Sequence, residues 1–245
     1  MDGSRTSSRG ELIASAILCA FLGAAPARAM DAGIESARPR VGAVTARSAS
    51  FGESNQEETG NCLLWTAGDR VYTLGDLHTV MTGEEGASDH VAEQIRVTVG
   101  KQSSRARLVW PREGQRDVRR LDIAILELQD GMVGQPFGPE VFQAAVGGLP
   151  KELYLAAPGH RSKIIPIEAP AIEYGSQWFI RRELSHGDSG GMVFALRDGR
   201  VIPYGFVSAI GSLPGDSARG TVIYGRDAMR IFINQFLRAP PSMAF

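Results

Sequence analysis

The chain has 245 residues, and its 26 lysines and arginines nearly balance its 27 aspartates and glutamates, so the formal net charge is −1. This balance gives no general electrostatic attraction to nucleic acids or anionic membranes, and a hydrophobic content of 43% argues against a wholly disordered chain. Only two cysteines are present, Cys19 and Cys62, which excludes a disulfide-built scaffold and a cysteine-rich zinc or iron–sulfur site.

The N-terminal 29 residues have the pattern of a secretory signal peptide. Residues 12–25 form an uninterrupted run of 14 apolar and small residues, too short to span a bilayer comfortably, and the small-x-small sequence Ala27-Arg28-Ala29 follows. We therefore expect residues 1–29 to be cleaved and the mature protein to be secreted or periplasmic, without a membrane anchor. A buried N-terminal helix is the alternative. Cleavage would leave Cys62 alone, so no internal disulfide is expected.

Residues 30–58 have little periodicity and are rich in Ala, Ser, Gly, Arg and Glu, which indicates a propeptide or a flexible lead-in. Short β-type runs separated by turn residues follow, beginning with a hairpin pattern at residues 62–74. Many short strands at spacings of roughly ten residues favour a sandwich or barrel over a βαβ fold. One amphipathic helix is predicted over residues 227–237. The other predicted strands are residues 95–99, 107–110, 121–128, 153–155, 163–165, 178–180, 192–194, 205–210 and 221–224.

The most specific string is His186-Gly187-Asp188-Ser189-Gly190-Gly191. A serine between glycines on a tight turn can expose its Oγ while nearby backbone N–H groups point to one spot, as an oxyanion hole requires. An ordinary turn is the alternative, because Gly, Asp and Ser favour turns for conformational reasons.

A serine nucleophile needs a base, and the base needs an orienting group. His78 follows the predicted hairpin, and Asp122 stands at the head of an apolar strand, where a carboxylate requires hydrogen-bond partners. His78 could instead be a loop histidine, and Asp122 a strand end that faces water. The order His, Asp, Ser, with separations of 44 and 67 residues, favours a catalytic set over coincidence.

These motifs together resemble the trypsin/chymotrypsin-like serine peptidases, in the bacterial, disulfide-free form. The GDSGG string, the Asp122-Ile123-Ala124-Ile125-Leu126 strand and the segment that ends at His78 are similar to three motifs of that family. The resemblance implies an all-β fold of two antiparallel six-stranded β-barrels, residues 59–134 and 135–245, with the active site between them and a C-terminal helix. It implies that Ser189 attacks, His78 transfers the proton, Asp122 orients His78, and the Gly187 and Ser189 amides form the oxyanion hole.

The same resemblance suggests substrate-binding residues. Glu183 stands where the family has the floor of the primary specificity pocket, so a basic P1 side chain is one expectation. A solvated charge cluster is the alternative for Glu183. Ser208 and Gly211 lie in a run that is similar to the family's strand along the substrate cleft, with Ala209 where an aromatic residue is common.

Asp188 raises the question of activation. One hypothesis is cleavage after Arg40, which would free the Val41 amine to pair with Asp188; the alternative is an internal arginine partner and no zymogen step. The sequence also departs from the family pattern before the histidine, where Gly75-Asp76-Leu77 puts a carboxyl group close to the base.

The sequence thus predicts an exported, monomeric serine endopeptidase that acts on protein or peptide substrates and needs no cofactor or metal. A catalytically weak or inactive protease-fold binding protein is the second hypothesis. An α/β-hydrolase fits worse, because that family places its histidine after the serine and no histidine follows Ser189. The four histidines are dispersed, without a metal-ligand spacing.

Overall fold

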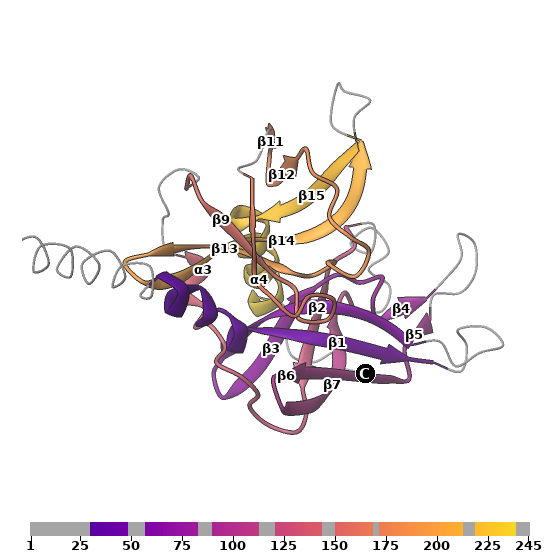
Figure 1. The fold of residues 1–245 in the computed structure, drawn as a ribbon. Coiled ribbons are helices and arrows are strands. Elements are labelled where there is room, and N and C mark those ends of the chain that lie inside the picture. The colour runs from indigo at the N-terminus through magenta and orange to yellow at the C-terminus, as the bar shows by residue number, and fades with distance from the viewer. Residues whose placement is uncertain are drawn as a thin grey trace, which may run out of the picture.

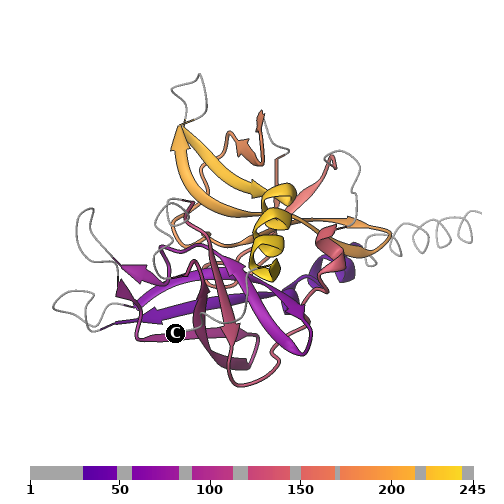
Figure 2. The ribbon, with the colours of Figure 1, turned by 180° about the vertical axis from the view of Figure 1, so that it is seen from behind.

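The computed structural model describes residues 30–48, 57–82, 90–112, 121–143, 150–168, 172–212 and 219–238. The predicted signal peptide and Cys19 lie outside these residues. Within them, no helix is both long enough and apolar enough to cross a membrane. The chain folds into two β-structures stacked on each other, with the C-terminal helix α4 (Arg226–Arg238) between them (Figure 1; Figure 2).

The N-terminal half is a closed antiparallel barrel with the strand order β1-β2-β3-β8-β7-β6. Alternate side chains point inward, so Val44, Leu64, Val97 and Leu126 are almost completely buried in its interior. A short hairpin of β4 (Met81–Thr82) and β5 (His90–Val91) lies beside it. The barrel strands are β1 (Val41–Arg47), β2 (Glu57–Ala67), β3 (Arg70–Gly75), β6 (Gln94–Val99), β7 (Gln102–Trp110) and β8 (Ala124–Leu128).

The predicted start of this barrel at residue 59 was too late. Residues 30–35 are helical, η1 (Arg38–Arg40) follows, and β1 pairs with both β2 and β6. Without β1 the barrel would have two open edges, whose unpaired N–H and C=O groups need partners. The residues expected to be a lead-in therefore supply the strand that closes the barrel.

The predicted hairpin is confirmed. Ala67 pairs with Arg70 across a two-residue turn, in which Gly68 has φ +63°. This positive φ is available to glycine without a steric penalty and matches the tight turns that join antiparallel strands. The hairpin register buries Leu64 and Leu74 and sends β3 toward the segment that carries His78.

The C-terminal half is an antiparallel sheet of seven strands with the order β10-β9-β13-β14-β15-β12-β11, curled but open. The predicted all-β fold with two β-structures and a C-terminal helix is confirmed, and the second predicted barrel takes the form of this curled seven-stranded sheet. Pro166 in β10 lacks a backbone N–H, which suits an edge strand. The strands are β9 (Leu153–Ala156), β10 (Ile165–Ile167), β11 (Ile172–Tyr174), β12 (Gln177–Ile180), β13 (Met192–Arg197), β14 (Arg200–Ser212) and β15 (Arg219–Gly225).

Aromatic packing joins the two halves. Phe236 of α4 lies 5.0 Å from Tyr72 and 5.9 Å from Trp65, and Phe232 lies 5.7 Å from Trp110, measured between ring centroids. The short helix α3 (Glu140–Gln143) adds Phe142 to the same cluster. Large buried aromatic rings contribute strongly to such an interface, so α4 fixes the barrel against the sheet and thereby the relative position of the site residues.

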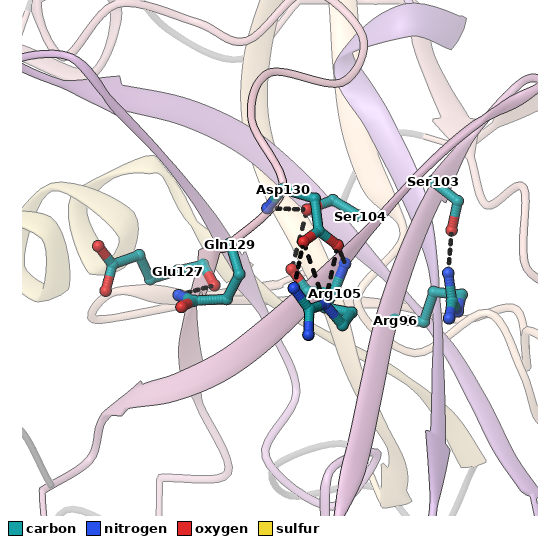
Figure 3. A network of polar contacts seen from close by, with 7 residues as sticks. All are labelled: Arg96, Ser103, Ser104, Arg105, Glu127, Gln129 and Asp130. Atoms are coloured by element: carbon teal, nitrogen blue, oxygen red, sulfur yellow. Dashed lines mark hydrogen bonds and ion pairs between the residues drawn. The ribbon is translucent and has the colours of Figure 1, made fainter.

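The outer surface of the barrel carries ion pairs between neighbouring strands. Arg105 on β7 forms a bidentate pair with Asp130, whose oxygen also accepts the Arg105 amide, and Ser104 bonds the Asp130 backbone (Figure 3). Hydrogen bonds from Arg105 lower the pKa of Asp130 to about 2. Because this pair is exposed, its effect on stability is small and screened by salt.

Candidate active site

The structure brings His78 and Asp122 together at one end of the barrel. His78 lies in the turn after β3, in which the Val80 and Met81 amides both bond the Leu77 carbonyl. One carboxylate oxygen of Asp122 accepts the His78 backbone N–H at 2.8 Å, and the other lies 2.7 Å from His78 Nδ1. The carboxylate thus holds both the backbone and the ring of His78.

This hydrogen bond is the largest cause of a raised pKa for His78, and burial opposes it in part. Since Nδ1 bonds a carboxylate, the Nδ1–H tautomer is favoured and Nε2 is left as the basic nitrogen. The His78 side chain is 51% exposed, which leaves that nitrogen accessible to an incoming group. The pair can therefore act as an oriented base.

Asp122 is presented by an unusual backbone conformation. Its φ is +52°, which side chains rarely adopt, so the strand predicted from residue 121 begins only at Ala124. Contacts on both sides hold this residue: the Leu77 amide bonds the Asp122 carbonyl at 3.3 Å, and the Tyr224 hydroxyl of β15 bonds the Leu121 carbonyl at 2.5 Å. A strained backbone persists only where neighbours hold it, and strain of this kind is frequent at functional sites.

Ser189 lies on a tight loop before β13. The Asp188 amide bonds the Ser185 carbonyl and the Gly191 amide bonds the Asp188 carbonyl, while Gly190 N–H donates to the Val207 carbonyl of β14 at 2.8 Å. Neither the Gly187 nor the Ser189 amide donates to another residue within the described ranges. The loop is thus pinned at its flanks, with those two donors unused by described residues.

No hydrogen bond joins Ser189 to His78 or Asp122 among the described residues. The nucleophile loop and the His78 turn share a neighbour instead, the Gly60–Asn61 segment of β2. A Cβ on Gly60 would lie 2.5 Å from Thr79 Oγ1, and the Asn61 amide bonds the Ser189 carbonyl at 2.8 Å. The two parts of the predicted site therefore pack on one strand.

Asn61 is a site residue that the sequence analysis missed. Its buried side chain donates from Nδ2 to the Gly187 carbonyl at 2.8 Å and to the Ser189 carbonyl at 3.0 Å, while Oδ1 accepts the Gly159 amide at 2.7 Å. These contacts hold the loop at Gly187 and at Ser189. The available signal was an asparagine directly before the apolar run of β2, where a buried amide needs partners.

Asp188 is completely buried and paired with Arg161. Nε and Nη2 of Arg161 lie 2.6 Å from its two carboxylate oxygens, and the Ser185 amide adds a bond of 2.9 Å. Val41, the N-terminus in the zymogen hypothesis, instead begins β1 and pairs with Leu63. The partner of Asp188 in this structure is thus an internal arginine, whose identity could not be read from the sequence.

The structure does not place Glu183 in a buried position. Its side chain is 43% exposed and forms an ion pair of 2.9 Å with Arg219. Thr221 ties the same segment to β15, because its hydroxyl donates to the Arg182 carbonyl and accepts the Leu184 amide. The solvated-charge alternative fits Glu183 better than a buried pocket floor.

The remaining predicted residues lie around the Ser189 loop or on β14. Ser208 is buried at a bulge of β14 opposite β15, and Gly211 pairs with Gly220 further along the same strand. His186 is exposed directly before Gly187. Gly187 has φ +93°, and a Cβ there would lie 3.1 Å from His160 Nδ1, which explains the requirement for glycine.

Comparisons with known proteins agree with this architecture at the level of the fold. No family model matches the chain, and no curated protein matches its sequence. A serine endoprotease from Yersinia pestis is similar in structure, with a TM-score of 0.59 and 17% identity over 85% of this chain and 66% of that chain. The Rv3671c protease from M. tuberculosis, in its active form, has a TM-score of 0.57 and 18% identity over 85% of this chain and 86% of that chain.

At 17% and 18% identity these similarities establish the fold. The chain thus shares the fold of these two proteases, here a closed barrel followed by a curled sheet. It spans slightly less than two thirds of the Yersinia pestis protease. A fold hosts many functions, so the activity has to be argued from the site.

Proposed function

We propose that this chain, built on the fold of serine endoproteases, is an exported serine endopeptidase that cleaves peptide bonds through an acyl-enzyme intermediate. The observation that carries the proposal is the double contact of Asp122 with the backbone and Nδ1 of His78. A carboxylate held in this way orients the ring, keeps the productive tautomer and stabilises the imidazolium that forms during catalysis.

The proposed reaction uses three side chains. Ser189 Oγ attacks the carbonyl carbon of the scissile peptide as its proton passes to His78 Nε2. His78 then protonates the leaving amine, which departs and leaves the acyl group on Ser189. Water, deprotonated by His78, attacks the ester and releases the second product, and the proton returns to Ser189.

The negative charge of each tetrahedral intermediate would be stabilised by the Gly187 and Ser189 amides. Preorganised donors aimed at the developing oxyanion are typically the largest single contribution in acyl transfer. Asn61 and the Arg161–Asp188 pair support this role, because Asn61 holds the carbonyl groups of Gly187 and Ser189 and Arg161 holds the side chain of the residue between them. Export, by the N-terminal signal pattern, is part of the same proposal and would appear as a processed product outside the cytoplasm.

Labelling with a fluorophosphonate, which reacts with activated serines, tests the proposal without knowledge of the substrate. Wild type should label, Ser189→Ala should not, and His78→Ala should slow labelling by about 10⁴-fold or more. Ser103→Ala is the matched control, since this exposed serine lies on the barrel surface. A folded wild type that never labels would overturn the proposal in favour of a protease-fold binding protein.

A further inference from the structure

Asp76, two residues before His78, is a buried carboxyl group that the proposed reaction does not use. Only 3% of the residue is exposed, and neither of its carboxyl oxygens has a hydrogen-bond partner among the described residues. A buried carboxylate without donors is strongly unfavourable, and such an unpartnered group calls for an explanation.

The groups around Asp76 supply negative charge rather than compensation. The Asp122 carboxylate acts on it from the turn before β8, and Asp76 acts in turn on the phenol of Tyr224 on β15. His78 on the same turn is engaged by Asp122, and Asp188 of the nucleophile loop is engaged by Arg161. Cys62 on β2, which pairs with Gly75, is a buried thiol whose pKa is raised to about 12 by burial.

Burial, and then the charge of Asp122, raise the pKa of Asp76 well above its ordinary value. The Gly190 amide opposes this shift in part. Its hydrogen bond, however, goes to the Val207 carbonyl at 2.8 Å, so it does not satisfy the carboxyl group. A second negative charge close to the Asp122 carboxylate is unfavourable, and His78 pairs with Asp122 rather than with Asp76.

We propose that Asp76 is protonated in the active protein and is a positioning residue for the Ser189 loop and the His78–Asp122 pair. This inference rests on the proposed function. The neutral acid leaves Gly190 N–H on the Val207 carbonyl and a single negative charge opposite His78. Ionised Asp76, after release of its proton to solvent, would compete for Gly190 N–H and draw the Ser189 loop from its position. The second charge would also raise the pKa of His78, so a smaller fraction of the histidine would be unprotonated and able to accept a proton at a given pH.

The proposal has a signature in stability that needs no enzymatic activity. A group protonated in the folded state and ionised in the unfolded state makes the unfolding equilibrium constant rise about tenfold per pH unit. This rise begins above the ordinary pKa of aspartate and ends at the raised folded pKa. It is opposite in sign to that of most aspartates, which stabilise proteins as the pH rises.

The first experiment measures unfolding by guanidinium from about pH 5 to about pH 9 in the full chain with Ser189→Ala, with and without Asp76→Asn. We expect the unfolding constant of the protein with Asp76, divided by that of the Asp76→Asn protein, to rise by up to about tenfold per pH unit over part of this range. Asp130→Asn is the matched control. The pKa of Asp130 is lowered to about 2, so the ratio of the unfolding constants with and without Asp130→Asn should not change over this pH range. A flat ratio for Asp76→Asn as well would overturn the proposal.

The second experiment measures the rate of fluorophosphonate labelling against pH. Wild type should lose reactivity at alkaline pH, and Asp76→Asn should shift this loss upward by about one pH unit or more. An identical alkaline decline in both proteins would overturn the positioning role. If neither protein labels at any pH, the proposed function fails, while the unfolding comparison still decides the protonation of Asp76.

If Asp76→Asn does not fold, an infrared measurement on the Ser189→Ala protein replaces the comparison between the two variants. It detects the band of a protonated carboxylic acid. A band that persists at neutral pH and disappears on alkaline titration supports the proposal, and its absence at neutral pH overturns it.

Discussion

Arg161 and Asp188 meet edge to edge, with two nitrogen–oxygen distances of 2.6 Å, at a point where the carboxylate is completely removed from solvent. Such bidentate, charge-assisted pairs are among the strongest hydrogen-bonded contacts in proteins. Because Arg161 is an internal side chain, the loop of Ser189 is anchored without a free N-terminus. We therefore expect full reactivity without cleavage after Arg40, which N-terminal sequencing of the labelled protein would check.

Replacement of Arg161 by alanine should destabilise the fold by about 3 kcal/mol, because Asp188 would remain buried without its cation. Arg161→Lys should retain part of this stability, since a lysine offers no fork for two oxygens. Denaturant unfolding in the Ser189→Ala background measures both. Arg219→Ala, which removes an exposed partner of Glu183, is the control and should change stability by less than about 1 kcal/mol.

Asn61→Ala should destabilise by about 1–3 kcal/mol, because it removes the side-chain partners of the Gly159 amide and the Gly187 carbonyl, while the Ser189 carbonyl keeps the backbone amide of residue 61. The labelling rate per folded molecule should also fall, since the peptides around Ser189 lose their restraint. Asn61→Asp should be the more damaging variant, as it directs a carboxylate oxygen at two carbonyls. Wild-type stability and labelling in Asn61→Ala would show that the contacts have no such role.

Gly190 and Gly199 allow a matched comparison that tests how tightly the Ser189 loop is packed. Both have positive φ, +75° and +71°, but a Cβ on Gly190 would lie 1.8 Å from the Asn61 carbonyl oxygen, whereas nothing lies within 4 Å of one on Gly199. Gly199→Ala should therefore cost only about 1–2 kcal/mol for its backbone conformation. Gly190→Ala should displace the loop and abolish labelling. Similar effects of the two changes would contradict this packing.

Reactivity should rise with pH through the titration of His78, with a midpoint above the ordinary histidine pKa of 6.5 because Asp122 stabilises the imidazolium. Asp122→Asn should move the midpoint down and reduce the rate by about 10⁴-fold. The His78–Asp122 pair stabilises the fold fully at pH values below the pKa of His78 in the unfolded chain. This stabilisation is lost as the pH rises through the higher pKa of His78 in the folded protein. A midpoint unmoved by Asp122→Asn would contradict this linkage.

Glu183→Gln should change the relative cleavage of peptides with basic and apolar P1 residues by less than about tenfold, because the carboxylate is exposed and already paired with Arg219. A peptide library digested by both proteins measures this ratio. Loss of a strong basic preference in the variant would restore Glu183 as a specificity residue. Glu173→Gln, on strand β11, provides the control.

Local features of the fold could be predicted because they depend on neighbours in the sequence. The hairpin at Gly68, the strand β6 ending before Gly100 and the amphipathic helix α4 follow from turn residues and from the spacing of apolar side chains. β1 was missed because its seven residues, VGAVTAR, become a strand through pairing with β2 and β6. Strand preference depends on such context more than helix preference does.

The sequence by itself determined the residues of the candidate site: the glycine-bounded Ser189, and His78 and Asp122 in order before it. Only the tertiary structure decided how they are held, because these contacts join residues far apart in the chain. Asn61 bonds carbonyls 126 and 128 residues away, and Arg161 bonds a carboxylate 27 residues away. Burial decided the rest: it enclosed Asp76 without a hydrogen-bond partner among the residues that the structure describes, and it left Glu183 in solvent. No local pattern in the sequence records which charged groups lose contact with water.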